Sequence, residues 1–236
     1  MTLMKLVYCR GGDPKAQIFT NKEWLYGIRS DYVPYGSVYM LDVKYHAGES
    51  VWPAHVAQAL TLRPALTMIP DYERPEQLPA LMAMHETLVS AGLQTFWCPK
   101  FEGALKDIPS YVVLAISVPT RYGGWLPMPA DVSGRRLHLL GGHPDHQHYL
   151  RYRVYTESDV ISADGNVAGL KAYLGQSWHE SGYWQQHGPN EYTNDALMMM
   201  SAQTIPHYMA CERVIYNMRR MQLIQRQFFQ QQELAM

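Results

Sequence analysis

The sequence predicts an α/β protein built as a (β/α)8 barrel of the TIM type, compact and irregular in places, with a C-terminal helical segment. Short apolar runs alternate along the chain with stretches that have helical periodicity. Most of the runs are continuously apolar rather than alternating, as parallel strands buried on both faces require. At 236 residues, 47% of them hydrophobic, the chain is slightly shorter than most such barrels. An open doubly wound sheet is the structural alternative.

Seven apolar runs are predicted to be strands, one fewer than a complete barrel contains. They span residues 5–9, 37–41, 65–69, 94–98, 111–117, 136–140 and 160–163.

Four stretches between these strands are predicted to be helices: 52–62, 75–90, 145–155 and 166–174. The stretch 75–90 has proline in its first turn, apolar residues spaced three and four apart, and a glycine soon after its end. It is the clearest helix of the sequence.

We predict a single domain over residues 1–236. Residues 1–175 form the barrel core, and 176–236 form an aromatic loop followed by helices that close the barrel. The last stretch, 211–236, is amphipathic and carries several basic residues, so it is expected to close the barrel or contact a second copy, with a phosphate-binding face as the alternative.

The composition of the chain excludes several classes of protein and of site but assigns no function. A formal charge of −1 gives no global attraction to polyanions, so any nucleic-acid contact needs a local basic patch. Three cysteines without a CxxC pair argue against a disulfide framework and a cysteine-rich zinc site, and favour the cytoplasm. No apolar stretch is long enough to predict a membrane span. Motifs of serine hydrolases, P-loop proteins, zinc proteases and dinucleotide-binding folds are absent from the sequence.

Three aspartates follow predicted strands. They are Asp42, Asp71 and Asp164. Because function in α/β barrels collects at the carboxyl ends of the strands, these carboxylates are expected to meet at one mouth. Two carboxylates can divide catalytic work between a nucleophile and a proton donor or acceptor. The alternative for each is a helix N-cap, a position that aspartate favours.

The segment LHLLGGHPDHQH places His143, His146 and His148 close together after a glycine pair. His143 and His146 could chelate a metal, but no third ligand is evident, so a metal-dependent hydrolase is only the weaker alternative. The histidines are expected to lie in a loop and on a helix surface. Gly141 and Gly142 would let backbone approach a ligand closely.

The same residues resemble those of the tRNA-guanine transglycosylases. The segment 137–175 is similar to that family's "HLxGxGxP" strand end, helix and short strand with the nucleophilic aspartate, which falls on Asp164. YMLDVKYHAGES resembles the "LDNGAxExG" segment of the DpdA-type 7-deazaguanine DNA transglycosylases, compact phage or bacterial relatives, and places their aspartate on Asp42. MIPDYERPEQLP resembles "PDxxxDxxxT", which places the base-recognising aspartate on Asp71.

The resemblance covers roughly residues 37–175 and includes departures from the family pattern. Val43-Lys44-Tyr45 replaces Asn-Gly-Ala after Asp42, and Pro99-Lys100 stands near an expected glutamine. The zinc-binding cysteines of the tRNA enzymes are absent, which favours a DNA-directed relative.

The resemblance implies base exchange, in which guanine in DNA is replaced by a 7-deazaguanine such as preQ0. Asp164 would be the nucleophile and Asp42 the general acid/base or positioning group. Asp71, Ser117, Gly141 and Gly142 would bind the base. The candidates for phosphate contacts are Arg121, Arg135, Arg151 and Arg153.

The same resemblance implies DNA as the polymer, with RNA as the weaker alternative, and neither cofactor nor metal. A protein partner or a homodimer could supply further binding surface. The expected location is the cytoplasm, that of the host if a phage encodes the protein. The competing hypothesis is a non-catalytic protein of the same fold that binds a base or nucleic acid.

Overall fold

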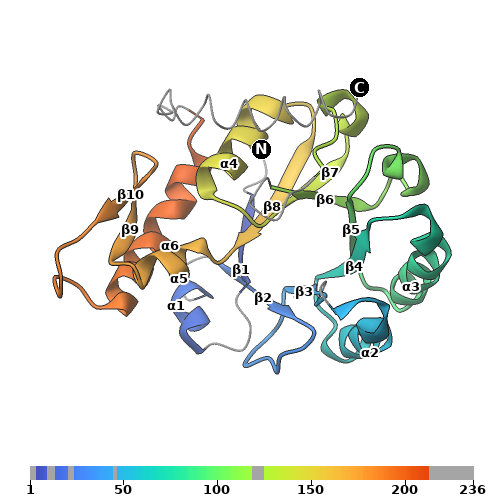
Figure 1. Ribbon diagram of the computed structural model, residues 1–236, viewed down its shortest axis with the longest axis horizontal. Helices are drawn as coiled ribbons and strands as arrows, with labels where there is room; N and C mark the ends of the chain where they lie inside the picture. The colour runs from blue at the N-terminus through green and yellow to red at the C-terminus, as the bar shows by residue number, and fades with distance from the viewer. Residues whose placement is uncertain (1–3, 10–13, 21–23, 45–46, 119–124, 213–236) are drawn as a thin grey trace.

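The protein is a closed barrel of eight parallel strands in the order β1 to β8, surrounded by helices, as a computed structural model shows (Figure 1). The structure describes residues 4–9, 14–20, 24–44, 47–118 and 125–212. Strand β8 pairs with β1 and completes the ring, with Val7 opposite Asp164. The predicted TIM-like fold is confirmed, and the open sheet is excluded.

The eight barrel strands are short, as their sequences suggested. They are β1 (Lys5–Cys9), β2 (Leu25–Arg29), β3 (Met40–Asp42), β4 (Leu66–Tyr72), β5 (Thr95–Pro99), β6 (Val113–Ser117), β7 (Arg136–Leu140) and β8 (Asp159–Gly165).

The α-helices differ widely in length. They are α1 (Gln17–Thr20), α2 (Trp52–Leu62), α3 (Leu78–Ser90), α4 (Pro144–Tyr149), α5 (Val167–Ala172) and α6 (Asn194–Ala210). Short 3-10 helices at Ala104–Asp107 and Pro129–Val132 follow β5 and β6, and no α-helix occurs there among the described residues. The barrel is therefore irregular on that side.

Strand β2 is the barrel strand that the sequence analysis missed. Gly27 interrupts its apolar run and weakens the strand pattern. A Cβ built on Gly27 would lie 2.7 Å from Val7 Cγ1 of the neighbouring strand, so the close approach of β1 explains the glycine. The structure also places Asp42, Asp71 and Asp164 within the last residues of β3, β4 and β8 rather than after them.

Two apolar layers hold the fold together. Inward-facing side chains such as Val7, Met40, Met68 and Phe96 fill the barrel. A larger cluster packs the outer faces of the strands against the helices. The filled interior leaves the carboxyl end of the barrel as the place where inward-facing polar side chains gather.

The segment after the barrel differs from the predicted aromatic loop. It forms an antiparallel hairpin of β9 (Gln176–His179) and β10 (Tyr183–Gln186), followed by α6. Helix α6 packs beside α1, α5 and β9 on the outside of the barrel (Figure 1). The Trp24 indole N–H donates to Ala202 O of α6 at 2.9 Å. Most of the predicted last helix, from residue 213, lies outside the described residues. No helix in the described part of the chain is long and apolar enough to cross a membrane.

Candidate active site

The carboxyl ends of the barrel strands carry a group of polar side chains. They are Cys9, Arg29, Asp42, Asp71, Ser117 and Asp164, with Lys100 directly after β5 and His138 deeper in the barrel, at the middle of β7. Parallel strand direction brings these positions to one end of the barrel. The three aspartates predicted to meet are therefore at the same mouth.

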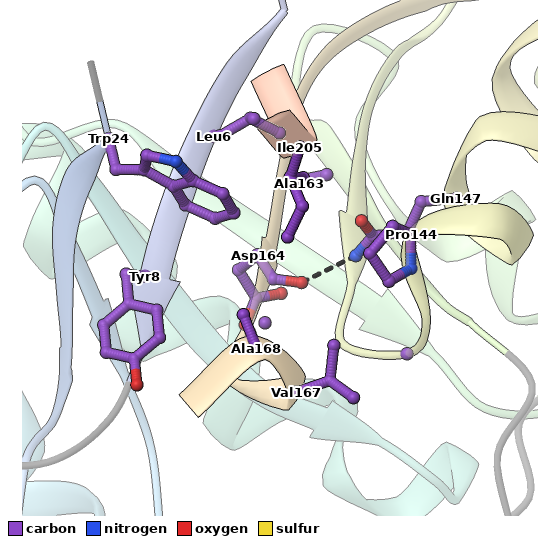
Figure 2. Close-up of a pocket in the computed structure, with 12 residues that line it drawn as sticks. Leu6, Tyr8, Trp24, Pro144, Gln147, Ala163, Asp164, Val167, Ala168 and Ile205 are labelled. Carbon is purple, nitrogen blue, oxygen red and sulfur yellow. Dashed lines mark hydrogen bonds between the residues drawn. The ribbon is translucent and has the colours of Figure 1, made fainter. Parts of the chain in front are cut away.

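Asp164 is held through one of its two carboxylate oxygens. The backbone N–H of Gly141 donates to Asp164 Oδ1 at 2.7 Å, and His138 Nε2 lies 3.2 Å from the same oxygen. The side chain of Gln147 fixes the neighbouring backbone, because its Nε2 donates to Asp164 O at 2.6 Å (Figure 2) and to Gly141 O at 2.6 Å. Asp164 is only 8% exposed, so its carboxylate is oriented before any substrate arrives.

His138 links Asp164 to the barrel interior. The ring is fully buried beside Phe96, with Nδ1 2.8 Å from Ser162 Oγ. An ionised carboxylate only accepts hydrogen bonds, so Nε2 carries the hydrogen toward Asp164. In the neutral ring, Nδ1 then accepts the hydroxyl hydrogen of Ser162. His138 thus orients Asp164 and stabilises its charge.

Replacing His138 with Phe is expected to slow attack by Asp164 about 10- to 100-fold, because the carboxylate loses one of the two donors that orient it and a misplaced reacting group costs up to about 100-fold. The measurement is the single-turnover rate of the reaction proposed below, with the melting temperature as a folding check. Ser162→Ala removes only the outer bond to Nδ1 and should cost less. An unchanged rate in a folded His138→Phe protein would show that His138 does not assist Asp164.

The pKa of the Asp42 carboxyl group is strongly raised. Burial raises its pKa from 3.8 to about 7, and the nearby charges of Asp164 and Asp71 add to the shift. The backbone N–H of Val43, which donates to Asp42 Oδ1 at 2.7 Å, and the charge of Arg29 oppose it. A carboxyl group with a pKa near 7 can both give and take a proton at neutral pH.

Asp71 forms an ion pair on the other side of the mouth. Lys100 Nζ lies 3.1 Å from Asp71 Oδ2 and donates to Ser117 Oγ at 2.8 Å. The Cys98 thiol lies next to the ammonium, and the pKa of Lys100 is raised by its neighbours Cys98 and Asp71 despite the opposing effect of burial. The predicted base contacts Asp71 and Ser117 are therefore joined by a lysine.

The two adjacent glycines, Gly141 and Gly142, have different structural roles. The Gly141 N–H donates to Asp164, whereas Gly142 lies against Val118, directly after the preceding strand β6. Both have positive φ, 67° and 85°, which favours glycine. A Cβ on Gly142 would lie 2.4 Å from Val118 Cγ1, but a Cβ on Gly141 would meet nothing within 4 Å.

Gly142→Ala is expected to lower the free energy of unfolding by about 2–5 kcal/mol, because backbone strain and overpacking add. Gly141→Ala, with backbone strain alone, should cost about 1–2 kcal/mol. Denaturant titrations of the two variants measure the difference. Equal losses would mean that Val118 moves aside freely.

The histidines of the segment lie beside the mouth in an aromatic cluster, not in a metal site. The Trp184 indole donates to His143 Nε2, and the His143 ring packs against Trp178. His148 is fully buried, and burial lowers its pKa to about 4, so its predicted place on a helix surface is wrong. No group of three or more potential metal-ligating side chains occurs within the described ranges.

Of the predicted phosphate-contacting arginines, the three that the structure describes are not brought together at the mouth. Arg135 precedes β7, at the opposite end of the barrel, and donates to Pro109 O at 2.8 Å. Arg151 donates to Met209 O of α6 at 3.0 Å, and Arg153 is exposed two residues further on. Arg121 lies outside the described residues.

Figure 2 shows a pocket behind Asp164, between the barrel wall and the surrounding helices. Its lining is largely apolar and includes Leu6, Trp24, Ala163 and Ile205. Leu6 and Ala163 belong to the outer apolar layer. This pocket therefore lies on the helix side of β1 and β8, and it adjoins the candidate active site, because Asp164 and Gly142 also line it.

A protein-family model matches residues 20–210, which include seven of the eight barrel strands and the whole of the polar mouth except Cys9. The chain belongs to the family of unknown function DUF6610. Neither the curated proteins nor the solved structures contain a match. Membership of DUF6610 thus assigns no activity to the chain.

Sequence reasoning missed the functional neighbours of the aspartates in this DUF6610 chain. His138 sits between Leu137 and Leu139 in an apolar run, and Gln147 sits among histidines. The sequence indicated Lys100 only as a departure from the transglycosylase pattern, near an expected glutamine. The available signal was the alternation along β7, which places His138 on the inner face, opposite to its two leucine neighbours.

Proposed function

We propose that the protein is a DNA base-modifying transglycosylase that exchanges guanine for a 7-deazaguanine such as preQ0 through a covalent aspartyl-glycosyl intermediate. The observation that carries the proposal is the pairing of two unlike carboxyl groups at the mouth. Asp164 has one oxygen fixed by Gly141 and His138, whereas Asp42 has a pKa near 7. Such a division of roles suits a double displacement at a sugar carbon.

The first displacement forms the covalent intermediate. Asp164 attacks C1′ of a deoxyguanosine with Oδ2, the oxygen away from Gly141, and the bond from C1′ to N9 breaks. The departing guanine takes a proton from Asp42, which leaves Asp42 ionised. Because the pKa of Asp42 is about 7, a sizeable fraction of the protein carries this proton at neutral pH.

The second displacement reverses these roles. N9 of the incoming 7-deazaguanine attacks C1′ as the bond to Asp164 breaks, and Asp42 accepts the N9 proton. No cofactor takes part, because each step exchanges one C1′ substituent for another without a change of oxidation state. The product is DNA with a modified base and one free guanine.

The polymer would enter at the carboxyl end of the barrel. A base inside a duplex cannot reach Asp164, so the nucleotide would have to be extruded from the stack. Arg29 and Lys44 are cations at this end, and both pair with Asp31. A partner that supplies further basic surface would fit the formal charge of −1.

The test is incorporation of labelled base. The protein is incubated with guanine-containing DNA and radiolabelled guanine or preQ0, and label in the polymer is counted. RNA of the same sequence and DNA without guanine serve as parallel substrates. Incorporation into guanine-containing DNA alone is expected. Folded protein that labels none of these polymers would overturn the proposal, and labelling of RNA alone would correct the polymer.

A further inference from the structure

The ion pair of Asp71 and Lys100 is placed where it can contact a ligand. Their side chains are 14% and 21% exposed, so neither is sealed in the core. Ser117, at the end of β6, holds the ammonium from the side through its hydroxyl group at 2.8 Å. A carboxylate and an ammonium are thus presented side by side at the mouth that contains Asp164.

Both groups keep capacity for a ligand. A carboxylate offers about four acceptor positions, and within the described residues only Asp71 Oδ2 is engaged, by Lys100. An ammonium has three donors, which here face Asp71, Ser117 and the thiol of Cys98. Sulfur accepts hydrogen bonds weakly, so a carbonyl oxygen that replaced Cys98 as a partner would be favoured.

An adjacent acceptor and donor match the edge of a cyclic amide. In a 6-oxopurine the N1–H is a donor and the neighbouring C6 oxygen is an acceptor. We propose that Asp71 and Lys100 together read this edge, with Asp71 accepting from N1–H and Lys100 donating to the C6 oxygen. The inference rests on the proposed function and deepens it by making Lys100 the residue that selects 6-oxopurines and their 7-deaza analogues.

Rejection of 6-aminopurines follows from the same geometry. A 6-amino group would direct its hydrogens toward the ammonium, and an N1 without hydrogen would face the Asp71 carboxylate. Sites that leave buried polar groups unpaired discriminate strongly against the wrong ligand. Ser117 acts in this arrangement by positioning Lys100, and it need not contact the base itself.

The test is base binding by the whole protein, measured by isothermal calorimetry without DNA. Guanine is compared with 2,6-diaminopurine, which differs at C6 and N1 alone. The wild-type protein is expected to prefer guanine at least about 100-fold. Lys100→Met, similar in length but without a donor, should reduce that preference at least about tenfold. Lys100→Gln, which restores a neutral donor, should recover part of it.

Lys106→Met is the matched control, because Lys106 is an exposed lysine in the same connection between β5 and β6. It should leave the preference unchanged, and thermal melts establish that each variant is folded. Wild-type protein without preference for guanine, or folded Lys100→Met and Lys100→Gln proteins that both keep the full preference, would overturn the role of Lys100.

The base-exchange assay separates this failure from failure of the proposed function. If the wild-type protein labels DNA but the Lys100 variants keep the preference, base exchange stands and the role of Lys100 falls. If the wild-type protein prefers guanine through Lys100 but labels no polymer, the recognition stands and the catalytic proposal falls.

Discussion

Asp164→Ala is expected to abolish base exchange, with a loss of at least about 1,000-fold, because the proposed mechanism makes Asp164 the group that bonds to C1′. The structure places Asp164 with one oxygen anchored by Gly141 and His138, so the second oxygen faces the reaction without competition from those donors. The measurement is guanine release from DNA in a single turnover, with denaturing gels to detect the protein–DNA adduct. Neither should be detectable in the variant.

Asp159→Asn provides the matched control for this substitution. Asp159 is an exposed aspartate at the other end of the same strand, β8. Its replacement changes the formal charge by the same amount and should leave adduct formation intact. A folded Asp164→Ala protein that still formed an adduct would assign the nucleophile to another residue.

Asp42→Asn is expected to slow guanine release about 100- to 10,000-fold, the usual contribution of a general acid. In the proposed mechanism this half-reaction requires protonated Asp42, whose pKa is raised to about 7. The rate should therefore fall as the pH rises through about 7. The measurement is guanine release between pH 5 and about 9 without added base. An asparagine variant with the same pH dependence would exclude Asp42 as the proton donor.

The same substitution should affect stability in the opposite direction. The folded protein holds the Asp42 proton more tightly than the unfolded chain, whose carboxyl group titrates near 3.8. Stability from this group is thus full at low pH and lost as the pH rises from about 4 to 7. Asp42→Asn should raise the melting temperature at pH 8, and the gain should shrink as the pH is lowered.

Much of the fold could be predicted, because continuous apolar runs identify buried parallel strands without knowledge of their partners. The positions of Asp42, Asp71 and Asp164 followed from the rule that strand ends share one edge. Strand β2 could not be predicted in this way, since Gly27 is required by the approach of Val7 and not by any local pattern. The contacts between side chains could not be predicted either, because tertiary structure determines them.

Lys100 and His138 illustrate that limit. Lys100 lies 29 positions from Asp71 in sequence, and only the pairing of β4 with β5 brings the two together. His138 reaches Asp164 because β7 pairs with β8 through a shift of register between Leu137 and His138. A shift of one residue reverses which side chains face inward, and a single sequence does not reveal it.

The candidate active site can assemble only after the last barrel strand has paired with the first. Asp164 lies on the last strand of the ring, opposite Val7 of the first, so this strand pairing joins segments more than 150 positions apart. Pairing between segments so far apart in sequence slows folding. During synthesis, β8 must leave the ribosome before the mouth can assemble, so a nascent chain that ends before this strand carries seven of the eight barrel strands but lacks Asp164.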